Sequence, residues 1–151
     1  MEWHLKRFAE LTTIELYQLI KLRIDVFVVE QQCLYAELDN KDIAEETRHL
    51  WCTNADGIIV AYLRILPMGL SYTQVSFGRV AVINEARGQT LGKQLVFKAI
   101  EHCHFIWPKQ SICIGAQKYL LLFYQDFGFK VISDTYLEDN IPHMDMLLEA
   151  N

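Results

Sequence analysis

The 151-residue sequence lacks several patterns that mark particular classes of protein. Its four cysteines, Cys33, Cys52, Cys103 and Cys113, have no CxxC spacing, which argues against a zinc ribbon and against a secreted disulfide framework. We therefore expect reduced thiols, most of them buried. The formal net charge is −5 and no cluster of Lys and Arg is present, so we expect no nucleic-acid partner, because phosphate recognition needs a basic face.

Long apolar segments are also missing. No apolar run approaches the roughly 20 residues of a membrane span, and residues 1–7 lack the apolar core of a secretion signal. We therefore expect no membrane partner and a cytoplasmic location. No repeat, low-complexity tract or linker interrupts the chain, so we expect residues 1–151 to form a single domain.

The most informative feature present is an apolar strand that runs into an Arg-Gly turn. It spans residues 78–92 and reads Gly-Arg-Val-Ala-Val-Ile-Asn-Glu-Ala-Arg-Gly-Gln-Thr-Leu-Gly. Such a turn directs several unpaired backbone N–H groups to one point, beside the positive end of a helix dipole. A pyrophosphate suits that position, so the turn predicts a phosphorylated cofactor. Taken alone it is a weak signal, because many short connections need glycine.

A second motif covers residues 117–129 and reads Gln-Lys-Tyr-Leu-Leu-Leu-Phe-Tyr-Gln-Asp-Phe-Gly-Phe. It predicts a helix that ends at Gly128 and a strand that begins at Phe129. Together the two motifs resemble the GNAT superfamily of acetyl-CoA-dependent N-acetyltransferases. Residues 22–33 and 136–144 are similar to one branch of that superfamily, the ElaA-like proteins, so the resemblance spans nearly the whole chain.

Each motif departs from the family pattern at one or two places. The pyrophosphate loop of the family reads Arg/Gln-x-x-Gly-x-Gly/Ala, and here Thr90 stands where its first glycine is usual. The second motif has Gln117 in place of asparagine and Leu120 in place of alanine, and it retains Tyr124. The resemblance implies that Tyr124 is the acid that protonates the departing thiolate.

The pattern predicts an α/β (α+β) fold with a mixed, partly parallel central sheet flanked by helices. We expect strands near residues 2–8, 47–53, 58–66, 75–83, 111–115, 129–137 and 143–148, and helices near residues 13–29, 91–103 and 117–127. Thr12 or Thr13 before Glu15 is a plausible N-cap for the first helix, and the turn of residues 54–57 predicts a hairpin between the second and third strands. The second helix has one apolar face, formed by Leu91, Leu95, Ala99 and Cys103. The resemblance implies that the strand with Val80 and the strand over residues 111–115 splay apart, so that pantetheine lies between them.

The resemblance also implies which residues bind acetyl-CoA. They are Val80, Ala81, Val82, Arg87, Gly88, Gln89, Thr90, Leu91, Gly92, Lys93, Gln117 and Phe123. A backbone N–H of residues 80–82 is expected to stabilise the oxyanion of the tetrahedral intermediate. Their side chains then matter for packing alone.

The general base is left open by the sequence. Glu138 and His143 are our candidates, and Glu37, Asp39, Asp42, Asp139 or a water chain are alternatives. The polar segment of residues 30–46 is long enough to be functional or mobile. We expect it to bind the acceptor, with Glu30, Glu37, Asp39 and Asp42 attracting a cationic amine.

These observations favour an N-acetyltransferase that transfers acetyl directly to a primary amine of a small cationic molecule or of a protein. A non-catalytic acyl-CoA-binding sensor or scaffold is the alternative, and an acyltransferase for longer acyl chains is a third reading. We expect no metal, because the adjacent residues of His102-Cys103-His104 point about 100° apart on a helix. A homodimer is an option that the sequence leaves open.

Overall fold

Four strand-forming segments near the N-terminus build the first sheet. In the computed structural model, which describes residues 1–150, they pair antiparallel in the order β1-β2-β3-β4. Their bounds are β1 (Glu2–Lys6), β2 (Arg48–Thr53), β3 (Ile59–Leu66) and β4 (Ser76–Val82). The predicted β2–β3 hairpin is confirmed: Oδ1 of Asn54 accepts from the backbone N–H groups of Asp56 and Ile58, and Gly57 takes the positive φ of the turn.

The first long helix begins where its capping residues predict. Thr12 Oγ1 accepts from the backbone N–H of Glu15 at 3.0 Å, and the Glu15 carboxylate accepts from the N–H of Thr12 at 2.9 Å. The helix α1 (Thr13–Arg23) continues as a π-helical segment, η2 (Ile24–Glu30), as far as predicted. It packs Leu19 and Leu22 against the face of the sheet that carries Trp51.

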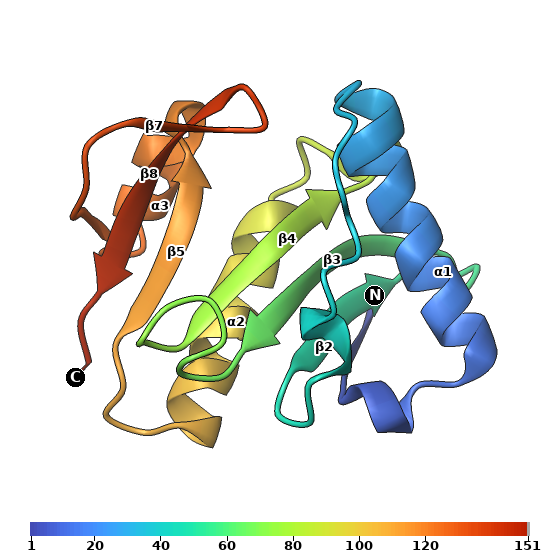
Figure 1. The fold of residues 1–151 in the computed structure, drawn as a ribbon. Coiled ribbons are helices and arrows are strands. Elements are labelled where there is room, and N and C mark those ends of the chain that lie inside the picture. The colour runs from blue at the N-terminus through green and yellow to red at the C-terminus, as the bar shows by residue number, and fades with distance from the viewer. Residues whose placement is uncertain (151) are drawn as a thin grey trace.

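The opposite face of the same sheet is covered by α2 (Leu91–Ile106), as Figure 1 shows. Its predicted apolar stripe, Leu91, Leu95, Ala99 and Cys103, is buried. Because side chains alternate along a strand, β2 directs Leu50 toward α2 and its neighbour Trp51 toward α1. One sheet thereby separates two apolar layers.

The remaining strands form a second antiparallel sheet in the order β5-β8-β6, with β7 paired to β8. Its elements are β5 (Ile112–Gln117), η5 (Lys118–Leu120), α3 (Leu121–Gln125), β6 (Lys130–Val131), β7 (Tyr136–Glu138) and β8 (Ile141–Leu148). The prediction of one strand over residues 129–137 is wrong. The segment divides into β6 and β7 because Ser133 Oγ accepts a hydrogen bond from the backbone N–H of Asp145 at 2.8 Å. A side chain thereby replaces the backbone partner that a continuous strand would offer to β8.

The two sheets meet where β4 and β5 begin. A single parallel bridge joins Val75 to Ile112, and the N–H of Cys113 donates to the Val75 carbonyl at 2.8 Å. Beyond it the two strands run in the same direction and diverge (Figure 1). All the named strand pairs are antiparallel, and the parallel part of the predicted sheet is limited to the Val75–Ile112 bridge between the two sheets. Within residues 1–150 no helix has both the length and the apolar character needed to cross a membrane.

Candidate active site

A cavity of about 1340 Å³ opens where β4 and β5 diverge. Its wall is built from β4, the turn before α2, β5, α3 and the β7–β8 hairpin. Pockets for drug-sized ligands measure roughly 300–1,000 Å³. This cavity is therefore large enough for a long cofactor and a second substrate together.

A β-bulge shapes the β4 side of the cavity. Tyr62 of β3 pairs with Ala81, and Arg64, two residues on, pairs with Gly78, so three steps on β4 oppose two on β3. Arg79 takes a positive φ of 54° at this point, and Val80 lies on the cavity wall. Such a bulge leaves backbone groups outside the ladder and bends the strand. Residues 80–82, predicted to hold the oxyanion donor, begin at this bulge.

The turn before α2 presents the amide groups that the sequence predicts. Thr90 is the N-cap residue of α2 with a φ of 61°, and its hydroxyl donates to the carbonyl of Gln89 at 2.6 Å instead of capping the helix. Among residues 1–150 we find no side chain that accepts from the first N–H groups of α2. Besides Arg87, five predicted residues of this segment line the cavity: Gly88, Thr90, Leu91, Gly92 and Lys93. Gln89 is exposed and does not line it.

Arg87 lies on the cavity wall but is already paired. Its Nη2 lies 2.5 Å from Oε2 of Glu30, and its Nε donates to the carbonyl of Val82 at 2.9 Å. The two side chains are 42% and 40% exposed, so water screens their attraction. A phosphate group that binds Arg87 has to compete with Glu30.

Tyr124 on α3 is buried beside the cavity, which it lines. Its ring makes T-shaped contacts with Phe123 and Phe129, with centroids 5.1 and 6.0 Å apart. Among residues 1–150 we find no hydrogen-bond partner for its hydroxyl. Burial raises the pKa of Tyr124, so the phenol stays protonated at neutral pH. Gln117 and Phe123, both predicted to bind the cofactor, line the same cavity.

The two predicted bases come together on the β7–β8 hairpin. His143 Nδ1 lies 2.7 Å from the carbonyl of Ile141, which makes Nδ1 the protonated nitrogen of the neutral ring. Its Nε2 lies 3.4 Å from Oε2 of Glu138. Glu138 and His143 line the cavity, and the imidazole stacks on Tyr136 at 5.9 Å.

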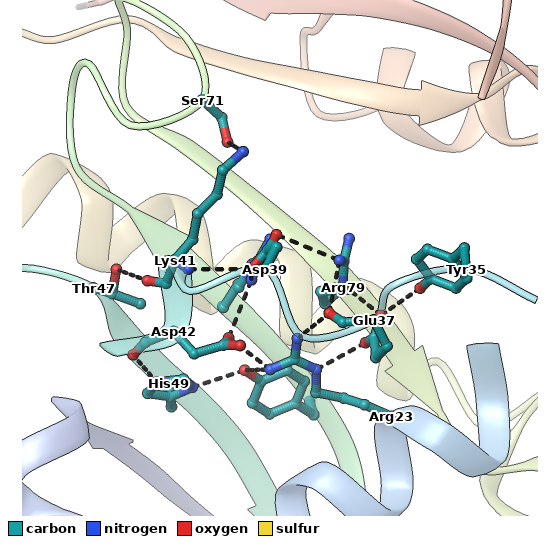
Figure 2. A network of polar contacts seen from close by, with 12 residues as sticks. Arg23, Tyr35, Glu37, Asp39, Lys41, Asp42, Thr47, His49, Ser71 and Arg79 are labelled. Carbon is teal, nitrogen blue, oxygen red and sulfur yellow. Dashed lines mark hydrogen bonds and ion pairs between the residues drawn. The ribbon is translucent and has the colours of Figure 1, made fainter. Parts of the chain in front are cut away.

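The acidic segment of residues 30–46 is bound to the body of the protein by arginines (Figure 2). Arg23 Nε donates to Glu37 Oε1 at 2.9 Å, and its Nη1 donates to Asp42 Oδ1 at 2.6 Å. Glu37 also accepts from the hydroxyl of Tyr35 and pairs with Nε of Arg79 at 2.8 Å. The structure does not place Glu37 or Asp42 on the cavity wall, because their carboxylates turn inward to these partners.

Asp39 does reach the cavity wall, together with its partner Arg64. Arg64 donates from Nη1 and Nη2 to the two oxygens of Asp39, at 2.7 and 2.6 Å, and from Nη1 to Asp42 at 3.1 Å. Burial opposes ionisation of Asp39, but the Arg64 guanidinium outweighs it and holds the pKa of Asp39 well below its usual range. Three arginines thus balance three carboxylates. We call Arg23, Glu37, Asp39, Asp42, Arg64 and Arg79 the arginine network.

The sequence did not single out the arginines of this network, nor Tyr72, Tyr136 and Asp145, which also line the cavity. One signal was present for Asp145. Polar residues occupy positions 143 and 145 of β8 and alternate with methionines at 144 and 146, which indicates one polar face. The arginines gave no such signal, since their partners lie far away in the chain. Among residues 1–150 no three His, Cys, Asp or Glu residues are grouped to hold a metal ion.

Comparison with known proteins identifies the class to which this arrangement belongs. Residues 18–150 match the family model described as an acetyltransferase (GNAT) domain, so the chain belongs to the GNAT acetyltransferase family. Within that family it is similar to protein ElaA of Escherichia coli, with 41% identity over 150 residues that cover 99% of this chain and 97% of ElaA. The resemblance to the ElaA-like branch is confirmed.

Solved structures agree with the fold. The crystal structure of Escherichia coli ElaA has a TM-score of 0.92 at 42% identity and covers 99% of this chain and 100% of that one. An acyl-CoA N-acyltransferase from Pseudomonas aeruginosa also has a TM-score of 0.92 at 42% identity, covering 97% of each chain. The predicted GNAT-like fold class is thereby confirmed.

Proposed function

We propose that this chain is an acetyl-CoA-dependent N-acetyltransferase that transfers acetyl directly to a primary amine of a small cationic molecule or of a protein. The observation that carries the proposal is the cavity between β4 and β5. Three groups line this one space: the amide-rich turn before α2, the hydroxyl-bearing Tyr124, and the bases of the β7–β8 hairpin. An acyl transfer needs an anion site, an acid and a base of this kind.

The turn before α2 is suited to the pyrophosphate of the substrate acetyl-CoA. The free N–H groups of the first turn of α2 donate to phosphate oxygens, and the helix dipole favours their negative charge. At Gly92 an added Cβ would meet only Val82 Cγ2, at 3.9 Å, so the backbone is open to the cavity. Arg87 adds a cation when it exchanges Glu30 for phosphate.

The chemistry divides between the two strands and α3. A neutral amine attacks the thioester carbonyl, and a backbone N–H of residues 80–82 at the β4 bulge stabilises the oxyanion. One such donor is worth about 3 kcal/mol in comparable sites. Tyr124 donates its proton to the departing thiolate as the C–S bond breaks, and its pKa, raised by burial, keeps that proton in place beforehand. The nitrogen carries one proton too many after the attack, and the loss of that proton gives the amide and restores the phenol of Tyr124.

The acceptor amine reaches this site as an ammonium ion and has to lose a proton. Nε2 of His143 and the carboxylate of Glu138 face each other at 3.4 Å on the β7–β8 hairpin. Either takes the proton and passes it to solvent, since the Glu138 side chain is 61% exposed. We propose His143 and Glu138 as this proton-accepting pair.

A screen for CoA release tests the proposal. Acetyl-CoA is incubated with alkylamines, polyamines, aniline and lysine-containing peptides, and free thiol is measured together with the acetylated product. We expect amine-dependent thiol release and product in equal amounts. Acetyl-CoA binding without transfer to any amine would reject the enzyme and favour the sensor. Acetyl-, butyryl- and octanoyl-CoA compared in the same assay measure the acyl-chain preference.

A further inference from the structure

Asp145 of β8 is a cavity carboxylate without a cationic partner. The hydroxyls of Tyr72 and Tyr136 both donate to its Oδ1, at 2.8 and 2.6 Å. Among residues 1–150 nothing donates to its other oxygen, Oδ2, and no lysine or arginine forms an ion pair with it. The carboxylate is therefore held in place at one oxygen and free at the other.

The backbone of β5 makes room for this arrangement. Gly115 is the strand partner of Asp145, and a Cβ at Gly115 would lie 2.9 Å from the hydroxyl oxygens of both tyrosines. That distance is shorter than side chains tolerate, so any larger residue would displace the phenols. The two tyrosines come from different parts of the chain, the β3–β4 loop and β7, and converge over this glycine.

Asp145 lies on the polar face of β8. Alternation along the strand puts His143 and Asp145 on one face and Met144 and Met146 on the other. Met146 belongs to the apolar core that also contains Tyr124. Asp145 therefore shares a face with His143, one of the proposed bases, and is separated by the sheet from the core around α3.

Three of the carboxylates proposed for the acceptor, Glu37, Asp39 and Asp42, are balanced inside the arginine network. The fourth, Glu30, is paired with Arg87 and becomes free only when Arg87 turns to a phosphate. Burial, together with the hydrogen bond to Asp145, raises the pKa of both Tyr72 and Tyr136. The two phenols thus remain neutral donors, and the charge of this cluster is that of Asp145.

We infer that Asp145 binds the ammonium group of the acceptor through Oδ2, and that Tyr72 and Tyr136 fix the orientation of its carboxylate. The inference rests on the proposed function, because it requires an acceptor in the cavity. It assigns the acceptor class to an alkylammonium ion. It also moves the recognising charge from the acidic segment of residues 30–46 to β8.

Steady-state kinetics of the Asp145→Asn variant test the inference. Asparagine keeps an oxygen that accepts from the two tyrosines and removes the charge. The cationic probe is 1,5-diaminopentane, followed by the best alkylamine of the screen, and the uncharged comparator is aniline. Loss of a charge-assisted hydrogen bond should raise KM for the alkylamine about ten- to a hundredfold. KM for aniline and for acetyl-CoA should stay unchanged.

A matched variant controls for the loss of one negative charge. Asp134→Asn makes the same change at an exposed position between β6 and β7 that does not line the cavity, and it should leave every KM unchanged. If Asp145→Asn no longer folds by circular dichroism, Tyr136→Phe replaces it. That variant keeps the charge but loosens the carboxylate, and it should raise KM for the alkylamine and not for aniline.

The outcomes separate the inference from the proposed function. An unchanged KM for the alkylamine, or an equal rise for aniline, overturns the role of Asp145 while transfer by the wild-type protein leaves the acetyltransferase standing. No transfer by the wild-type protein to any amine rejects the acetyltransferase and the inference with it.

Discussion

Side chains on the cavity wall differ in whether their polar groups already have a hydrogen-bond or ionic partner within the protein. Arg87 and Asp39 have ionic partners, whereas no partner is seen for the Tyr124 hydroxyl within the described chain. A group without a protein partner is free to exchange a proton or a hydrogen bond with substrate. This difference decides which substitutions should affect turnover and which should affect binding.

Replacing Tyr124 with phenylalanine should lower kcat by about ten- to a thousandfold. The phenyl ring retains the contacts with Phe123 and Phe129, so the melting temperature and the affinity for CoA should stay close to wild type. Stopped assays of thiol release and calorimetry with CoA measure the two effects separately. Tyr17→Phe, on the exposed side of α1, is the control. Normal turnover of Tyr124→Phe would leave Tyr124 with a packing role alone.

Replacing Glu30 with glutamine should strengthen CoA binding, because it releases Arg87 for the phosphates. The pair is exposed, so the gain should be only about two- to fivefold. Calorimetry at two salt concentrations measures it, and the gain should shrink at high salt. Glu85→Gln, an exposed carboxylate in η4 (Asn84–Ala86), controls for net charge. Weaker binding in Glu30→Gln would show that the pair supports the site.

At the scale of elements, the start of α2 should be the part of the cavity wall where added side-chain bulk weakens CoA binding most. Gly92→Ala should be tolerated, since its Cβ would meet Val82 at an ordinary contact distance of 3.9 Å. Gly92→Val adds bulk over the free amides and should weaken CoA binding tenfold or more. Calorimetry on both variants, with circular dichroism as a check on α2, makes the comparison. Equal CoA affinity in a folded Gly92→Val variant would remove this turn from the site.

Local elements were predictable where their signals are local. The capping residues Thr12 and Glu15 identify the start of α1, and the stripe of Leu91 and Leu95 identifies α2. The break between β6 and β7 was missed, because Ser133 reveals its role only through a hydrogen bond to distant Asp145. When a side chain replaces a backbone partner in this way, the alternating pattern of apolar and polar residues that predicts a strand does not change.

At the scale of the whole molecule, the sequence did not reveal which charged side chains form ion pairs with one another. Arg23 reaches partners 14 and 19 residues away, and Arg64 reaches one 25 residues before it. In the sequence the acidic segment therefore resembles a solvated loop, whereas in the fold it is bound to the sheet. The predicted cytoplasmic location concerns surroundings outside a single chain and stays a prediction, and the option of a homodimer stays open for the same reason.

Acid should destabilise the protein in two steps. His49 is buried as a neutral ring that accepts from Tyr62 at Nδ1 and donates from Nε2 to the carbonyl of Asp42. Burial lowers the pKa of His49 in the folded protein, so at mildly acidic pH the ring is protonated in the unfolded chain and stays neutral in the folded one. The free energy of unfolding should therefore fall as the pH drops below about 6.5, the ordinary pKa of histidine.

The second loss should begin below about pH 4, the ordinary range of an aspartate. Although burial opposes it, Arg23 and Arg64 lower the pKa of Asp42 in the fold, and this stabilisation disappears as the carboxylate is protonated. Urea denaturation between pH 7.5 and pH 3 measures both losses. A His49→Gln variant should show a smaller first loss and keep the second, because burial also lowers the pKa of His102, which retains its share of the first loss. Unchanged stability from pH 7 to pH 5 in the wild-type protein would contradict the role of His49.

The divergence of β4 and β5 also affects how the protein behaves toward copies of itself. Each of these strands is the last of its sheet on that side, and an unpaired last strand exposes N–H and C=O groups that invite intermolecular β-pairing and aggregation. Here the two face one another across the cavity, joined by the Val75–Ile112 bridge at one end. The unpaired backbone groups of β4 and β5 are thereby turned toward the cavity and away from neighbouring molecules. The gap between the two strands can admit an extended ligand without offering an edge on which another copy of the chain could add a strand.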